Sequence, residues 1–587
     1  MTIRTLGDLV FRLREVAAGR PDLLNRRRGD RLEAVSTTDV LRNVHSLALA
    51  LEAEGARPGD RIAIFSENRP EWHEVDLACQ LLGLPTVPIF PALPASQAAY
   101  ILRNSGSRWV FYSDAARRDV LIQAESRLAG PVRSVAFDED AVREDGTTLF
   151  RLMGDQAEAR GTIPLERFRD RAGEDDLASI VYTSGTLGDP KGVRLTHRNL
   201  VSNILACSEI FDLRPEDRAI SFMPLSHIFQ RTVDYLCLYR GVPLFYVPSV
   251  ERLPRALGEV KPSLLVAPPQ FYVRAHRRAQ ASIERLPLWR RKLARWGLEV
   301  GMQYAKARHG GIVGPWLALE RRVAEQWVYR PLRQRFGGRL RLAITGGAAL
   351  PEPTEWFFEA VGLPIFQGYG LTETSPVLTV SAPGRRRPGS VGRALPGVEI
   401  RLDEDGEILV RGPGIMDGYW ENPQASADAL EDGWLRTGDL GEIDAAGFVF
   451  VTGRKKDLIV TSAGENVAPQ PIEQHLSGLA GVQQAVVLGN DRPYLVALIV
   501  PDFELWQAEF GEPSADGLIQ RPELVERVGA LVESLNEQLA QHEKIRRFAL
   551  LSEPLTAEAG ELTPTLKPRR LKISEIHRET LDRLYAR

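Results

Sequence analysis

The stretch RIAIFSENRPEWHEVDLACQLLGLPTVPIF, residues 61–90, decides the fold class. It begins with a short apolar run (61–66), continues with apolar residues at helical spacing (70–82) and ends with a second apolar run (86–90). Short uninterrupted apolar runs indicate buried strands, and a helix between two of them is typical of parallel α/β architecture. The stretch therefore predicts a strand–helix–strand unit.

The same alternation extends outward in both directions. A helical pattern precedes the unit at 38–54. Further along the chain, residues 271–336 are rich in arginine and have apolar residues at helical spacing, with no convincing strand. We interpret 271–336 as a helical insertion in a large layered α/β domain. Further strands are predicted at 109–113, 179–183, 220–223, 244–247, 264–267 and 340–345.

The pattern changes near residue 398. Residues 398–455 are predicted to be a β-rich subdomain, because short apolar runs there are separated by Asp-Gly and Ala-Gly turn signals. A smaller α+β pattern follows the charged segment GRKKD at 453–457. We place the boundary at Lys456, which gives a large N-terminal domain (1–455) and a small C-terminal domain (456–587).

Composition excludes several classes of protein. The 587 residues are 44% hydrophobic and carry a net charge of −3, which does not suggest a nucleic-acid-binding protein. The three cysteines are widely spaced in apolar stretches, which excludes a disulfide scaffold. Without a signal-peptide pattern or a run of ~20 apolar residues, we expect a cytoplasmic protein, with peripheral contact between the arginine-rich insertion and a membrane left open.

The segment YTSGTLGDPKG, residues 182–192, has the chemistry of a phosphate-binding loop. Glycines let backbone N–H groups converge on an anion, hydroxyls add donors, and a lysine adds charge. The chain has 9 lysines against 65 arginines, so a lysine in this loop suggests a need for a compact ammonium. An ordinary Gly/Pro turn is the alternative. The candidate groups are Thr183, Ser184, Gly185, Thr186, Gly188 and Lys191.

A second constellation, QGYGLTET (367–374), follows an apolar run where ligands of α/β proteins bind. Tyr369 is suited to stack on a base, Thr372 to bind a phosphate and Glu373 to hold Mg²⁺. A carboxylate that only stabilises a helix N-terminus is the alternative for Glu373.

Three later candidates lie further apart in the chain. In DGWLRTGDLGEIDAAGFVFVTGRKKD (432–457), Asp439 is suited to accept from ribose hydroxyls and Arg454 to donate to them, unless the segment is only a β-meander with charged turns. Lys567, between prolines in LTPTLKPRR, is a further candidate. The alternative is that it is only a solvated charge near the C-terminus. His227, in MPLSHIFQR, is suited to line an apolar pocket that binds the acid substrate. The alternative is a core histidine whose nitrogens are hydrogen-bonded within the protein.

Taken in order, these motifs resemble the adenylate-forming superfamily of acyl-CoA synthetases, luciferases and nonribosomal adenylation domains. SENRPEW (66–72), PLSHIFQR (224–231) and the helical insertion resemble bacterial long-chain fatty-acyl-CoA synthetases more narrowly. The match spans most of the chain. The resemblance implies an α/β N-terminal domain with a small mobile C-terminal domain.

The resemblance also implies roles for individual residues. The 183–191 loop would bind the triphosphate, with Thr186 and Glu373 near Mg²⁺, and Lys567 would be the mobile catalytic lysine. Lys456 would be the hinge between the domains. ATP or AMP would further contact Gly346, Gly347, Ala348, Gln367, Gly368, Tyr369, Gly370, Thr372, Asp439 and Arg454, and CoA would contact Ser462, Gly464 and Glu465.

The implied activity is activation of a long-chain fatty acid by ATP and Mg²⁺, followed by transfer of the acyl group to CoA. Leu187 and Ala463 depart from the family pattern in the phosphate and CoA loops. An adenylating enzyme with another acid or a carrier-protein acceptor stays open, as does a catalytically silent lipid- or nucleotide-binding homologue. Chain-length preference and oligomeric state, a dimer among the options, are not determined by the sequence.

Overall fold

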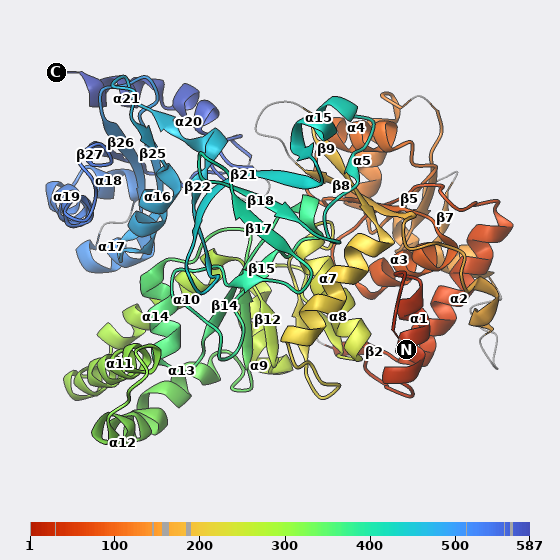
Figure 1. Cartoon of the computed structure of the whole chain (residues 1–587), viewed down its shortest axis with the longest axis horizontal. Helices are drawn as coiled ribbons and strands as arrows, with labels where there is room; N and C mark the ends of the chain where they lie inside the picture. Colours follow the sequence, from red (N-terminus) through yellow and green to blue (C-terminus); the bar gives the residue numbers. More distant parts are fainter. Residues whose placement is uncertain are drawn as a thin grey trace.

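A computed structural model of the chain (Figure 1) gives the arrangement of these elements. The structure describes residues 2–29, 31–128, 130–143, 146–154, 164–183, 189–511, 514–556, 558–563 and 567–586.

The stretch 61–90 forms the predicted unit. Strand β3 (Ile62–Phe65) leads to helix α3 (Pro70–Leu82), and β4 (Thr86–Ile89) returns parallel to β3. The helix ends at Gly83, whose left-handed backbone (φ 69°) favours glycine. The strand–helix–strand prediction is confirmed.

Both faces of this first sheet are covered. Ile62 and Ile64 join one apolar core while Ala63 and Phe65 join another, as expected for side chains that alternate along a buried strand. In the described residues the sheet has the order β19-β9-β8-β4-β3-β5-β6-β7. Its other strands are β19 (Gly418–Tyr419), β9 (Lys191–Thr196), β8 (Leu177–Thr183), β5 (Trp109–Tyr112), β6 (Arg133–Ala136) and β7 (Thr147–Thr148).

A second large sheet supplies the other half of the N-terminal domain. Its order in the described residues is β16-β15-β14-β13-β12-β10-β11-β1-β2, with a parallel centre. The predicted strands at 220–223, 244–247, 264–267 and 340–345 all lie in it; β1 and β2 were not predicted, because arginines interrupt their apolar pattern. The strands are β1 (Leu24–Arg28), β2 (Arg31–Val35), β10 (Ala219–Ser221), β11 (Leu244–Tyr246), β12 (Leu264–Val266), β13 (Leu342–Thr345), β14 (Ile365–Tyr369), β15 (Thr379–Val380) and β16 (Arg393–Ala394).

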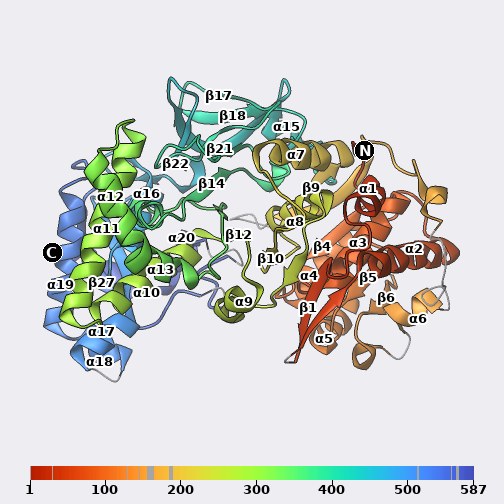
Figure 2. The same ribbon diagram turned by 90° about the horizontal axis from the view of Figure 1, so that it is seen from below.

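Helices α7 (His197–Ile210) and α8 (Ile228–Arg240) lie between the two sheets (Figures 1 and 2). They bury apolar residues in the core that both sheets share. The other α-helices before residue 261 are α1 (Asp8–Val16), α2 (Thr37–Ala53), α4 (Ala95–Ser105), α5 (Ala115–Glu125), α6 (Leu149–Met153) and α9 (Leu253–Val260).

A buried charge pair fixes α8 against the first sheet. Arg231, the last residue of the PLSHIFQR motif, is fully buried and pairs with the equally buried Asp76 of α3. The guanidinium also donates to Ser179 Oγ (2.8 Å) and to Tyr235 Oη (2.6 Å). Because a buried charge is tolerated only when it is paired and hydrogen-bonded, this motif residue orients the helix that follows His227.

Residues 271–336, all of them described, contain helices and no strand. The helices are α10 (Pro269–Glu284), α11 (Leu288–His309), α12 (Pro315–Ala324), the π-helical turn η5 (Glu325–Tyr329) and α13 (Arg330–Gln334). Helix α11 packs on α14 (Glu352–Ala360), and α12 packs on α11 at the periphery of the molecule (Figure 1).

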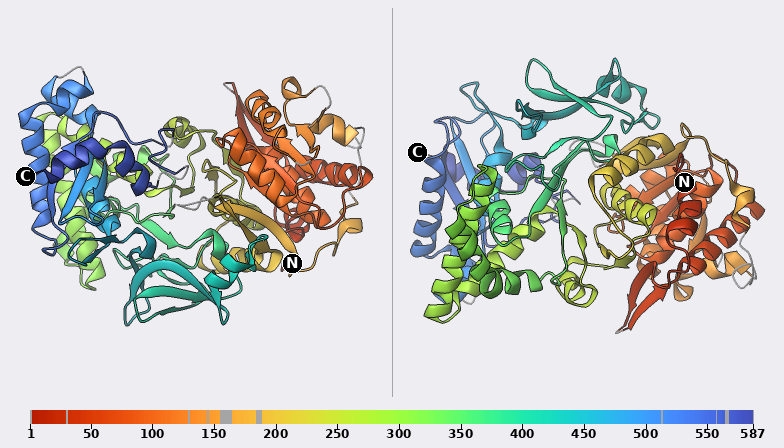
Figure 3. Two further views of the ribbon diagram at one scale, coloured as in Figure 1. Left: turned by 90° about the horizontal axis from the view of Figure 1, so that it is seen from above. Right: turned by 60° about the horizontal axis from the view of Figure 1, so that its bottom comes forward.

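A third, antiparallel sheet follows and lies beside the two large ones (Figure 3). Its strands lie within the stretch predicted to be rich in β-structure, residues 398–455. It contains β17 (Glu399–Leu402), β18 (Glu407–Arg411), β20 (Leu430–Glu431), β21 (Trp434–Ile443) and β22 (Val449–Arg454), with α15 (Pro423–Ala429) before β20.

The smaller C-terminal domain has apolar cores of its own. A turn, η7 (Lys455–Asp457), leads into a hairpin of β23 (Ile459–Val460) and β24 (Asn466–Val467). The sheet β25 (Val482–Leu488), β26 (Leu495–Pro501) and β27 (Ile545–Leu550) follows. Its helices are α16 (Pro469–Gly478), α17 (Phe503–Phe510), α18 (Ala515–Ile519), α19 (Pro522–Asn536), α20 (Arg570–Ile576) and α21 (Arg578–Tyr585). Within the described ranges, every helix is too short or too polar to cross a bilayer.

Candidate active site

The predicted phosphate loop connects the two strands of a hairpin. Thr183 ends β8 and pairs with Lys191, the first residue of β9, and its Oγ1 donates to the Lys191 carbonyl (3.4 Å). An antiparallel β8–β9 ladder flanks the loop. Five of the loop positions lie outside the described residues: Ser184, Gly185, Thr186, Leu187 and Gly188.

Tyr419 connects this loop to the second motif. The Lys191 ammonium lies over the Tyr419 ring, 4.9 Å from its centroid, and the Tyr419 hydroxyl donates to Glu373 Oε1 (2.9 Å). Tyr419 reaches this position because β19 pairs with β9 beside the loop. The Tyr419 side chain therefore contacts both Lys191 and Glu373.

Glu373 stands just beyond the end of a parallel strand. It belongs to the short helix η6 (Thr372–Thr374), which follows β14, and its backbone carbonyl accepts from Met416 N (2.9 Å). Between the strand and η6, a Cβ on Gly370 would lie 1.7 Å from the Pro376 carbonyl oxygen. This close backbone contact accounts for glycine at that position.

The glycine turn after β13 is open on one side. Gly347 has a left-handed backbone (φ 82°), and a Cβ there would meet nothing within 4 Å, whereas one on Gly346 would meet Phe229. Ala348 follows Gly347 and is exposed. Gln367, by contrast, is buried, and its Oε1 accepts from Leu350 N (3.2 Å), so its side chain holds the chain beyond this turn.

The TGD turn and the GR segment meet in a hydrogen-bonded group. Tyr369 Oη donates to Asp439 Oδ2 (2.9 Å), while Arg454 Nε lies 3.0 Å from Asp439 Oδ1. Register explains the second contact, since Asp439 of β21 pairs with Arg454 of β22. Burial raises the pKa of Asp439, and the cation and the phenol act in the opposite direction. The carboxylate is thereby held in one orientation.

Lys567 comes to the same place from the C-terminal domain. Burial lowers the pKa of its ammonium, and the nearby Arg454 lowers it further, while Asp439, Asp457 and Glu373 oppose that shift. Lys567 is exposed to solvent, so it lies at the surface of the site rather than in an apolar core. A lysine near the C-terminus thus joins carboxylates more than a hundred residues away.

His227 lies near Lys567. It precedes α8, and its pKa is lowered by burial and by the Lys567 ammonium. It is not among the residues that line the apolar pocket described next, to which α8 contributes instead Phe229, Thr232, Val233 and Leu236.

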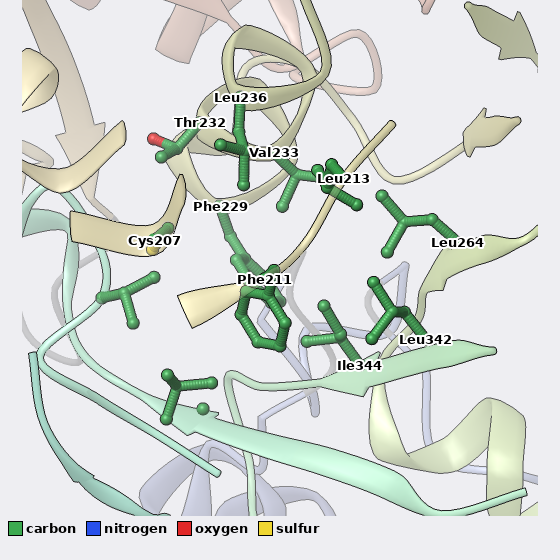
Figure 4. Close-up of a pocket in the computed structure, with 13 residues that line it drawn as sticks. Cys207, Phe211, Leu213, Phe229, Thr232, Val233, Leu236, Leu264, Leu342 and Ile344 are labelled. Atoms are coloured by element: carbon green, nitrogen blue, oxygen red, sulfur yellow. The ribbon is translucent and has the colours of Figure 1, made fainter. Parts of the chain in front are cut away.

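That apolar pocket lies between α8, α7 and the second sheet (Figure 4). The pocket is narrow, with a cavity volume of about 40 Å³. Gly368 of the QGYG motif forms part of its wall, which places the pocket directly beside the strand that carries Tyr369. The other lining residues are Cys207, Phe211, Leu213, Leu264, Leu342, Ile344, Val377 and Val380.

The predicted hinge and CoA loop lie at the surface. Lys456 is exposed in η7, and its neighbour Lys455 forms ion pairs with Asp405 and with Glu407. The predicted CoA-contacting residues Ser462, Gly464 and Glu465 are exposed in the turn of the β23–β24 hairpin. No hydrogen bond or ion pair joins that turn to Lys567 in the part of the chain that the structure describes.

Two residues of the site were not predicted, Tyr419 and Asp457. Tyr419 lies in PGIMDGYW, where an aromatic pair follows a glycine turn, a signal that is weak until β19 is seen to pair with β9. Asp457 ends the GRKKD segment, and its proximity to Lys567 depends on the docking of the C-terminal domain.

Comparison with known proteins identifies the family. A model described as "AMP-binding enzyme" matches residues 13–420, and one described as "AMP-binding enzyme C-terminal domain" matches 456–587. The long-chain-fatty-acid--CoA ligase FadD15 of Mycobacterium bovis is 33% identical over 562 residues, with 94% of this chain and 92% of that protein covered.

Solved structures share the fold. An anthranilate CoA ligase, AuaEII, in complex with anthranoyl-AMP superposes with a TM-score of 0.75 at 21% identity, covering 98% of both chains. A Mycobacterium tuberculosis fatty acyl CoA synthetase superposes with a TM-score of 0.63 at 23% identity, over 98% of this chain and 99% of that one. On these matches and the site described above, the chain belongs to the family of AMP-binding enzymes.

Proposed function

We propose that this protein is an AMP-forming long-chain fatty acid–CoA ligase. In the first half-reaction a fatty carboxylate attacks the α-phosphorus of ATP, giving acyl-AMP and pyrophosphate. In the second the CoA thiol attacks the acyl carbonyl and AMP leaves. The observation that carries this proposal is that Lys567 of the C-terminal domain lies close enough to Glu373 and Asp439 for their charges to act on it, while Gly368, next to Tyr369, lines an apolar pocket.

The first half-reaction joins two anions, so it needs positive charge at the point of attack. We assign Lys567 to the α-phosphate and the attacking carboxylate, where a compact ammonium neutralises the charge that builds up. Lys191 is assigned to the outer phosphates together with the 183–191 loop. The Tyr369–Asp439–Arg454 group is assigned to the ribose, because the fixed Asp439 carboxylate can accept from both hydroxyls.

Glu373 fits a Mg²⁺ ion that accompanies ATP. Tyr419 fixes one oxygen of the carboxylate without neutralising it, and hard carboxylate oxygens are what Mg²⁺ prefers. The second predicted ligand, Thr186, lies outside the described residues. When bound, Mg²⁺ supplies charge compensation on the phosphates.

The apolar pocket supports a long alkyl chain as the substrate. Its wall is built mainly from Phe, Leu, Ile and Val side chains, with Cys207 and Thr232, and it includes Gly368 of the QGYG strand and residues of α8. Phe229 lines the pocket two residues after His227, and His227 lies near Lys567, so we assign the carboxylate of the acid to the side of the pocket towards these two residues.

We further propose that the small domain, residues 456–587, rotates at Lys456 between the two half-reactions. The described orientation suits adenylation, because Lys567 lies near Asp439 and Glu373, whereas no described hydrogen bond or ion pair joins the exposed turn of Ser462, Gly464 and Glu465 to Lys567. A rotation would bring that turn to the acyl-AMP for thioester formation. Proline at position 456 fixes φ and should separate the two half-reactions. Retention of both at wild-type rates in Lys456→Pro would contradict the hinge.

The proposed activity is tested by incubating the protein with ATP, Mg²⁺, CoA and acids from acetate to oleate, while AMP release and acyl-CoA are measured. We expect both products with long-chain acids and little with acetate. Absence of ATP–pyrophosphate exchange that depends on fatty acid would indicate a catalytically silent homologue. Exchange without acyl-CoA would indicate a different acceptor.

A further inference from the structure

Helix α16 of the small domain contacts the N-terminal domain at both of its ends. Before its start, a Cβ on Gly453 of β22 would lie 2.9 Å from Ala468 Cβ. At its end, a Cβ on Gly478 would lie 3.2 Å from Pro351 Cβ. Glycine allows a close approach at both points, so α16 lies directly against the N-terminal domain, next to α10 and α14 (Figures 1 and 2).

A hydrogen bond fixes the second of these ends. Arg277 of α10 donates to the Ser477 carbonyl in the last turn of α16, where a cation also interacts favourably with the helix dipole. Apart from the chain connection itself, it is the one hydrogen bond or ion pair that joins residues 1–455 to residues 456–587 within the described ranges. Burial lowers the pKa of the Arg277 guanidinium, and the nearby Asp502 of the small domain opposes that shift.

The N-terminal side of this contact is formed by two helices that are fixed to each other. His276, which precedes Arg277, stacks on Phe357 of α14 with the ring centroids 4.1 Å apart, and its Nδ1 lies 3.2 Å from Thr354 Oγ1. Pro351 immediately precedes α14 and follows the glycine turn after β13. The surface that receives α16 is therefore continuous with the candidate active site.

On the other side, α16 is tied to the segment that carries Lys567. Arg570, three residues after Lys567, donates to Glu473 Oε2 (2.6 Å), and Glu473 lies one turn before Ser477 on α16. Glu473 is buried, and its Oε1 accepts from Val487 N (2.8 Å). Charge-assisted hydrogen bonds to a buried carboxylate have a well-defined geometry, so the position of α16 determines where the lysine lies.

We propose that Arg277 is a positioning residue for the adenylation half-reaction. This inference rests on the proposed function and on the proposed rotation at Lys456. The hydrogen bond to Ser477 stabilises the orientation in which Lys567 lies near Asp439, and it has to break before the small domain rotates. Arg277 does not touch the reacting atoms. It acts through α16 and Lys567, and so it sets the balance between the two half-reactions.

Arg277→Met in the full-length protein tests the proposal, because methionine keeps an apolar stem and removes the donors. ATP–pyrophosphate exchange with oleate should fall at least about ten-fold, the effect expected when one hydrogen bond from a charged donor is lost. Acyl-CoA formation from supplied oleoyl-AMP and CoA should stay at the wild-type rate or rise. Arg278→Met is the matched control, because Arg278 is exposed on the same helix, and it should keep both activities.

Two further variants separate positioning from a general loss of folding. Gly478→Val sets a branched side chain against Pro351, so it should reproduce the selective loss of exchange from the other side of the contact. In a Lys567→Ala background, Arg277→Met should cause no further loss of exchange, because a residue that acts only through Lys567 has nothing left to position. Damage to the fold would instead lower exchange in both backgrounds alike.

Three results would overturn the inference. One is a wild-type rate of exchange in Arg277→Met, and another is an equal loss of both half-reactions in that variant. The third is a further loss of exchange when Arg277→Met is added to Lys567→Ala. Absence of oleate-dependent exchange in the wild-type protein itself would instead refute the proposed function.

Discussion

Replacement of Lys567 by alanine should remove the first half-reaction selectively. The side chain comes from the C-terminal domain and lies near Glu373 and Asp439, yet it contacts solvent and is not part of an apolar core. Its removal should therefore leave folding intact. We expect adenylation to fall while thioester formation from supplied acyl-AMP continues.

The expected magnitude follows from the charge environment of Lys567. The ammonium is partly desolvated, so its interaction with developing negative charge is stronger than in water. Loss of one well-placed donor of this kind costs roughly 2.7–4 kcal/mol, or 10²–10³ in rate. The neighbouring Arg454 does not replace it, because Arg454 is already paired with Asp439.

The pH dependence provides a second measure of the same group. Burial and Arg454 lower the pKa of Lys567, so its charge is lost as pH rises through a value below the ordinary lysine pKa of about 10.4. Adenylation should therefore decline on the alkaline side earlier than an exposed lysine would allow. Lys567→Arg stays charged at all these pH values, so it should be slower but without that alkaline decline.

Adenylation is assayed by ATP–pyrophosphate exchange with oleate, and the second step by acyl-CoA formation from oleoyl-AMP and CoA. Lys572→Ala is the matched control, since Lys572 lies on α20 and pairs with the exposed Glu575. The control should retain both activities. Equal loss of both half-reactions in Lys567→Ala would refute the reasoning. So would a wild-type rate of ATP–pyrophosphate exchange in that variant.

Three further substitutions probe the frame of the site. Tyr419→Phe removes the hydrogen bond to Glu373 and should lower exchange about ten-fold with a raised Mg²⁺ requirement; an unchanged Mg²⁺ titration would count against it. Arg231→Met leaves the buried Asp76 carboxylate unpaired and should lower the free energy of unfolding by about 3–5 kcal/mol in urea titrations, a loss absent if the pair is not buried in solution. Gly370→Ala sets a methyl group against the Pro376 carbonyl and should abolish exchange; wild-type exchange would show that the strand end can relax.

The sequence by itself was sufficient for the elements whose signals are local. Apolar runs and helical spacing predicted the strand–helix–strand unit at 61–90 and the helices between 271 and 336, because burial imposes those periods directly on the chain. Glycine and hydroxyl residues at 182–192 predicted a loop, and this segment connects β8 to β9. Arginine-rich β1 and β2 escaped prediction, because their charged side chains obscure the strand pattern.

Only the tertiary structure decided which of these groups meet. Tyr419 and Glu373 are 46 residues apart, and their hydrogen bond depends on β19 joining the edge of the first sheet. Arg231 and Asp76 are 155 residues apart, and nothing in either local pattern marks them as partners. The position of Lys567 likewise depends on how the small domain docks. Such contacts arise from the packing of layers, whose energy is shared among many distant residues and leaves no periodic trace in the chain.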